Sequence, residues 1–126
     1  MEEPIIRLIE KMLYQKIILY NDLLNCFHEE RVSLINVDLD KLWRISQEKE
    51  EICTKIESAR MNILAGVHHH KEEKSFHLKT IMQRIPLEYK EKFQKLYLRL
   101  IKLKSEIDVL RKENMTFIDD SLNFLD

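Results

Sequence analysis

The chain has 126 residues with one glycine and two prolines, and 34 % of its residues are charged. So few turn-forming residues are typical of a bundle of long helices with a solvated outer surface. The 21 basic and 22 acidic side chains nearly cancel, so the overall charge favours neither a nucleic acid nor a membrane surface as partner. The sequence has no run of roughly 18 apolar residues and no signal-peptide pattern, which predicts a cytoplasmic protein without a membrane span.

The first predicted helix spans residues 4–36 and begins at Pro4, whose missing N–H is harmless in a first helical turn. Its apolar stripe is wide enough to contact two neighbouring helices rather than one. Asp38 suits the N-cap of a second helix over 39–65, and the short connection between them predicts an antiparallel hairpin. The stripe of the first helix consists of Ile9, Met12, Leu13, Ile17, Leu19, Tyr20, Leu23, Leu24, Phe27 and Leu34.

The second predicted helix carries a narrower stripe, and Gly66 stands directly after it. This is the only glycine in the chain, and a glycine forms a left-handed helix end at the least cost, so the helix is predicted to stop there. Residues 67–85 then make a His-rich connection with room for a short helix. Trp43 is interpreted as the edge of the hairpin core, with a binding anchor as the alternative. The stripe consists of Leu42, Ile45, Ile52, Ile56, Ala59 and Ile63.

The side chains that could carry chemistry do not form a recognisable site. The histidines at 68–70 cannot all reach one ion from a helix, and no Cys or carboxylate spacing completes a tetrahedral set with His77, so we expect a solvated loop. Cys26 and Cys53 do not face each other across the hairpin, which predicts two buried free thiols. Without a glycine-rich loop, a nucleophile elbow or a Cys-His motif, we expect no enzyme activity, no metal and no cofactor.

Residues 87–125 carry the clearest pattern, an apolar seam whose steps alternate between four and three residues. This is the period of a supercoiled helix that runs along other helices. Arg31 and Lys49 also fall at seam positions of their helices and are expected to extend toward solvent, whereas Asn114 is expected to fix the register. The seam is Tyr89, Phe93, Leu96, Leu100, Leu103, Ile107, Leu110, Asn114, Phe117, Ser121 and Phe124.

These patterns predict one all-α domain over residues 1–126. We expect an elongated three-helix antiparallel bundle or coiled coil with a long C-terminal amphipathic helix. The first two helices form the hairpin and the third lies alongside it.

The end of the third helix has a second apolar stripe one residue after the seam, formed by Met115, Ile118, Leu122 and Leu125. Both stripes together exceed one core-facing side, so part of this surface is predicted to remain for another protein. Three aspartates near the helix C-terminus oppose the helix dipole and weaken that end. Residues 110–125 are therefore the predicted partner-binding segment, with contacts at Leu110, Asn114, Met115, Phe117, Ile118, Ser121, Leu122, Phe124 and Leu125.

Three stretches of the chain also form an ordered set of motifs. The run YNDLLNCFHEERVSLINVDLDKLWRISQEKEEICTKI passes from a Leu-rich helix through a "D-L-x-x-L" start into a second helix bearing "E-K", at Asp38, Leu39, Leu42, Glu48 and Lys49. IPLEYKEKF opens the third helix, and ENMTFIDDSLNFLD closes it with "S-L-x-F" after an asparagine, at Asn114, Ser121, Leu122 and Phe124. In this order the motifs resemble those of the FlgN-type flagellar export chaperones. The likeness covers nearly the whole chain, and only the His-rich stretch 67–75 matches no feature of the family.

The resemblance implies a protein that acts by binding. Chaperones of this type hold hook-filament junction proteins, also called hook-associated proteins, soluble in the cytoplasm before the flagellar type III secretion apparatus exports them. They hydrolyse no nucleotide. The resemblance also implies that the C-terminal amphipathic helix captures a C-terminal helical segment of the client and prevents its premature association.

Two other functions stay open from the residues alone. A structural coiled-coil protein with no export client would associate with itself through the third helix, as a homodimer or higher oligomer. A nucleic-acid-binding module would use residues 71–112, which carry twelve basic and six acidic side chains, and its binding would weaken steeply with salt. Acidic residues interrupt that stretch and no aromatic side chain lies on its polar face, so we favour a solvated helix flank there.

Overall fold

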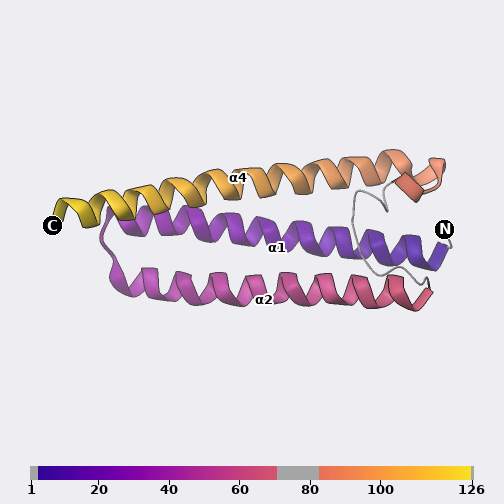
Figure 1. Ribbon diagram of the computed structural model, residues 1–126, viewed down its shortest axis with the longest axis horizontal. Coiled ribbons are helices and arrows are strands. Elements are labelled where there is room, and N and C mark those ends of the chain that lie inside the picture. The colour runs from indigo at the N-terminus through magenta and orange to yellow at the C-terminus, as the bar shows by residue number, and fades with distance from the viewer. Residues whose placement is uncertain (1–2, 71–82, 126) are drawn as a thin grey trace.

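Three long helices make up the part of the chain that this computed structural model describes, residues 3–70 and 83–125, with side chains over 3–62 and 83–123. Their bounds are α1 (Glu3–Ile35), α2 (Leu39–His70) and α4 (Leu87–Leu125). α1 lies in the middle, and α2 and α4 pack on its two sides without backbone contacts to each other in the described residues (Figure 1). α2 runs back along α1, and α4 runs in the direction of α1 (Figure 1). The predicted all-α bundle is confirmed.

The core lies mainly between α1 and α4. Ile45 and Ala59 are the buried apolar side chains of α2 among those described, and Ile52 and Ile56 are half-buried against the core. Fully burying an Ile, Leu, Met or Phe side chain stabilises a fold by roughly 1.5–3 kcal/mol relative to exposure. α4 buries more of these side chains than the described part of α2, so α4 is held more strongly. The core residues are Ile5, Ile6, Ile9, Met12, Leu13, Ile17, Leu23, Leu24, Phe27, Ile85, Phe93, Leu96, Leu100, Leu103, Ile107 and Leu110.

The wide stripe on α1 and the seam on α4 behave as their spacing predicts. α1 buries apolar side chains toward both neighbours, so the prediction that it contacts two helices is confirmed. On α4 the seam is buried from Phe93 to Asn114. After Asn114 it becomes exposed at Phe117 and Ser121, because α1 ends at Ile35 and α4 continues past that end.

The turn between α1 and α2 contains a strained residue. Asp38 N–H donates to the Ser33 carbonyl at 2.9 Å and Val37 N–H donates to the Leu34 carbonyl at 3.3 Å, which is the Schellman pattern of a helix end. That pattern puts Val37 in the left-handed region, with φ of 53°. A glycine adopts this conformation freely, whereas a residue with a β-carbon is destabilised there by roughly 1–2 kcal/mol.

Asp38 caps α2, as predicted. Its Oδ1 accepts a hydrogen bond from the Lys41 N–H at 3.1 Å, and its carbonyl accepts one from the Leu42 N–H at 3.0 Å. The carboxylate therefore satisfies a backbone donor that has no partner inside the helix. The turn ends one helix and begins the next within three residues.

The prediction that α2 stops at Gly66 is wrong, because α2 continues to His70. No glycine in the described residues has a positive φ. One glycine inside a helix costs about 1 kcal/mol, which is too little to end a helix that no proline follows. Residues 68–70 therefore belong to the last turn of α2 and not to a loop. The predicted short helix falls mostly on 71–82, outside the described residues, as does His77.

Two further predictions about α2 are wrong. Cys26 is buried and free as predicted, but Cys53 is exposed. Trp43 is 66 % exposed and so does not form the edge of the hairpin core. Both errors have one cause: within residues 3–70 and 83–125, α2 packs on α1 and not on α4, so much of its surface faces solvent. The alternative of Trp43 as a binding anchor stays open.

None of the described helices is long and apolar enough to cross a membrane.

We predict that Asp38→Ala lowers the free energy of unfolding by about 1 kcal/mol, because the Lys41 N–H loses its cap. Asp40→Ala is the matched control, since Asp40 is an acidic residue in the first turn of α2 with no capping bond among those described. It is expected to cost only a few tenths of a kcal/mol. Urea unfolding followed by circular dichroism measures both, and equal losses would contradict the cap.

Candidate functional site

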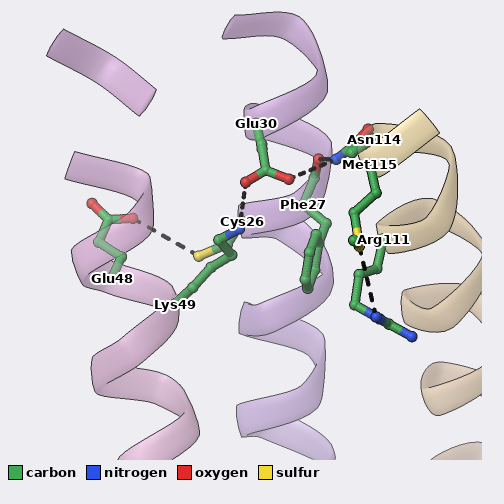
Figure 2. A network of polar contacts seen from close by, with 8 residues as sticks. All are labelled: Cys26, Phe27, Glu30, Glu48, Lys49, Arg111, Asn114 and Met115. Atoms are coloured by element: carbon green, nitrogen blue, oxygen red, sulfur yellow. Dashed lines mark hydrogen bonds and ion pairs between the residues drawn. The ribbon is translucent and has the colours of Figure 1, made fainter. Parts of the chain in front are cut away.

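A polar network joins all three helices near the turn. Asn114 of α4 is 2 % exposed, and its Nδ2 donates to the Phe27 carbonyl and to Glu30 Oε1 on α1, both at 3.0 Å (Figure 2). The other carboxylate oxygen of Glu30 pairs with Lys49 of α2 (Figure 2). The Lys49 ammonium also lies 4.6 Å from the centre of the Phe27 ring. Asn114, Glu30 and Lys49 are therefore each paired within the network.

The network fixes where α4 sits along α1. A carbonyl and a carboxylate one turn apart can accept from Asn114 in only one register, so sliding α4 by a turn would leave buried groups unpaired. Two ion pairs on the surface also join α1 and α4, and both link residues 82 positions apart in the sequence. They are Arg31 with Glu113 at 2.6 Å and Lys92 with Glu10 at 2.7 Å. Exposed pairs of this kind contribute little stability, so the register depends on Asn114.

Beyond Asn114, α4 and the α1–α2 turn enclose an apolar groove of about 830 Å³. Four of its lining residues come from the hairpin and five from the end of α4. Asp120 is the one charged residue among them. The lining consists of Leu34, Val37, Leu39, Leu42, Phe117, Ile118, Asp120, Ser121 and Leu122.

The groove is bordered by apolar side chains that face solvent. Val37 is 73 % exposed, Leu39 71 % and Leu122 57 %. Ile35, next to the turn, is exposed as well. Scattered exposed apolar side chains are normal, but a cluster around a groove marks an interaction site. We take this groove, with its two walls, as the candidate site.

The residues predicted from the sequence fall into four groups. Phe117, Ile118, Ser121 and Leu122 line the groove. Leu110 and Asn114 are buried against α1, so they position α4 and offer no free surface. Met115 is exposed outside the groove lining, with its sulfur 3.9 Å from Arg111 Nη1 (Figure 2). The side chains of Phe124 and Leu125 lie outside the described ones.

The hairpin wall of the groove was not predicted from the sequence. Leu34 and Leu42 were assigned to helix stripes, Leu39 to the start of the second helix and Val37 to the connection. A signal was present. Turns are usually polar, yet Val37 and Leu39 place two branched apolar residues on either side of the capping Asp38. Apolar residues in a turn suggest that the turn itself is a contact surface.

The described residues offer no grouped metal ligands, and their buried thiol is not activated. They include no group of three or more His, Cys, Asp or Glu side chains that could hold a metal ion. Burial, and then the nearby Glu48 carboxylate, raise the pKa of the Cys26 thiol to about 11. Glu48 Oε2 lies 3.9 Å from the Cys26 sulfur (Figure 2). The thiol is therefore protonated at neutral pH and a poor nucleophile. What the site can do is bind an apolar surface.

Fold and site together define an all-helical binding protein. A family model described as FlgN protein matches residues 4–126, nearly the whole chain. The chain belongs to the FlgN family, which is a family of flagellar export chaperones and not of enzymes. The resemblance inferred from the motifs is confirmed. No curated protein and no solved structure matches the chain.

We predict that Asn114→Ala lowers the free energy of unfolding by about 1–3 kcal/mol, because the Phe27 carbonyl and Glu30 lose a buried donor. Asn123→Ala removes an exposed asparagine of the same helix and is expected to change stability by less than about 0.5 kcal/mol. Urea unfolding compares the two variants. Similar losses would show that the network does not hold α4.

We predict that stability falls as the pH rises from 9 toward 11, partly through Cys26. The folded state holds the thiol proton up to a pKa of about 11, whereas an unperturbed thiol releases it near 9.0. Stabilisation from the buried thiol is therefore complete below pH 9 and lost as the pH approaches the folded pKa. Chemical unfolding at several pH values should show a shallower decline for Cys26→Ala. Cys53→Ser, at an exposed thiol, should decline like the parent chain.

Proposed function

We propose that this chain is a cytoplasmic flagellar export chaperone that binds hook-filament junction proteins. It prevents their premature association and delivers them to the flagellar type III secretion apparatus. The family match over residues 4–126 carries this proposal. The apolar groove at the end of α4 supports it, because a groove bordered by exposed apolar side chains is a surface on which another protein can bind.

The geometry suits capture of a client helix. An amphipathic helix can lay its apolar side into a groove and cover side chains that would otherwise face water on both partners. In this chain α4 is held on α1 up to Asn114 and presents its next residues at the groove. The client contacts on α4 are Phe117, Ile118, Ser121 and Leu122, joined by Met115, Phe124 and Leu125, while Leu110 and Asn114 hold the helix in place. The bound segment is a C-terminal helix of the junction protein.

Self-association is the second candidate, and a separate observation favours it. Leu98, Ile101 and Val109 of α4 are exposed and lie outside the groove. A structural coiled-coil protein would pair through such residues and form a homodimer without any client. The two functions therefore require different surfaces of the same helix.

We predict that changing Ile118 and Leu122 together to Asp abolishes capture of a purified hook-associated protein. Two carboxylates would then lie in the groove, where a bound helix would bury them without partners. Changing Leu98 and Ile101 to Asp is the matched control, because it introduces the same charges at exposed positions of the same helix. Pull-down measures binding, and circular dichroism checks that both variants stay helical.

Light scattering decides between the two candidates. Loss of capture in the groove variant alone, with a monomeric free chain, supports the chaperone. No capture by the parent chain, with a dimer that the Leu98 and Ile101 variant dissociates, supports self-association. Unfolding of the groove variant would place Ile118 and Leu122 in the core and contradict a binding role.

A further inference from the structure

Val37, in the hairpin wall of the groove, has a strained backbone conformation that the turn itself does not require of a valine. The two hydrogen bonds of the turn, from Val37 N–H and Asp38 N–H, use backbone atoms and would form equally well around a glycine. The chain instead has a β-branched residue at a φ of 53°, the least suitable kind of side chain for that region. Because Val37 is 73 % exposed, little packing within the described residues offsets the strain.

A second local defect lies beside the first. Ser33, one turn before Val37, is 1 % exposed, and its Oγ has no hydrogen-bond partner among the described residues. Strained and unsatisfied groups that persist in a fold are concentrated at functional sites, because something other than stability keeps them there. Both defects are at the end of the bundle that holds the groove.

We infer that the α1–α2 turn is the second wall of the client-binding site, and that Val37 is retained at a cost in stability because its side chain contacts the client helix. Leu39, exposed on the other side of Asp38, contributes to the same wall. This inference rests on the proposed function. It adds that the client is gripped between two elements and not by α4 alone.

The charges around the groove indicate its occupant, an amphipathic partner helix with a Lys or Arg beside its apolar stripe. Asp120 is the one charged lining residue, and Asp119 is exposed next to it. Both lie toward the C-terminus of α4, where the helix dipole adds negative potential. A second copy of this chain suits the groove poorly, because a symmetric contact between two grooves would bring the aspartates of both copies together.

Val37→Gly separates binding from stability. The thermal midpoint is expected to rise by about 2–5 °C as the turn loses its strain. Affinity for a purified hook-associated protein is expected to fall about tenfold, because the isopropyl contact is lost. A stabilised variant that binds more weakly is the signature of a strained contact residue. A purely structural Val37 would leave affinity unchanged.

Two further variants control for changes in the turn itself. Leu39→Ser removes an exposed apolar side chain of the same wall without changing the strained residue, and it should also weaken binding severalfold. Val32→Ala shortens an exposed valine of α1 outside the groove and should bind like the parent chain. Fluorescence titration measures affinity, and a thermal melt measures stability for each variant.

The outcomes keep this inference apart from the proposed function. If the Val37 and Leu39 variants bind normally while the Ile118 and Leu122 variant does not, the turn wall is refuted and the α4 site stands. If all of them bind normally, the groove is not the client site at all. A drop in the thermal midpoint of Val37→Gly would refute the claim that the backbone of Val37 is strained. A shift from dimer to monomer in either turn variant would make a second copy the occupant, and so refute the partner helix.

Discussion

The register of α4 on α1 is the constraint on which the site depends, and Asn114 sets it. Its amide donates to a backbone carbonyl and to Glu30, and Glu30 also pairs with Lys49 of α2. These bonds determine how much of α4 lies against α1 and how much extends past the end of α1. The last buried position of the seam is Asn114 itself, and Phe117 is already exposed. The network is thus part of the site although it is not a contact surface.

The groove follows from a mismatch in length between parallel helices. α4 has 39 residues and α1 has 33, so α4 continues where its support ends at Ile35. The chain reverses at that same place, where Val37 of the turn and Leu39 at the start of α2 line the groove opposite the overhanging helix. In the described residues the backbones of α2 and α4 make no contact, and α2 reaches the groove through Leu39 and Leu42 at its first turn. An apolar surface is left that the described residues do not cover.

Features that depend on one helix were predictable from the sequence, whereas features that depend on how helices and the turn pack together were not. The alternating steps of the α4 seam and the capping role of Asp38 follow from the residues on one helix, and the structure confirms both. The end of α2 was predicted wrongly because the low helix propensity of one residue, Gly66, does not outweigh that of the rest of the helix. The burial of Cys53 and Trp43 was predicted wrongly because it would need a second neighbour for α2, and the described part of the chain supplies only α1. Most of the α4 half of the groove could be predicted from the seam and the second stripe at the end of the helix. The hairpin half could not, because it depends on where the turn lies relative to the overhanging end of α4.

An asparagine at position 114 serves a binding protein better than a leucine would, although a leucine would stabilise the core more. Apolar side chains pack acceptably in several registers, and a slip of one helical turn moves a helix by about 5.4 Å. Such a slip would carry Phe117 and Ile118 out of line with Val37 and Leu39 and divide the groove. Hydrogen bonds to the Phe27 carbonyl and to Glu30 can be made only at one offset. The stability given up at Asn114 therefore keeps the two walls of the groove opposite each other, as a helix gripped between them requires.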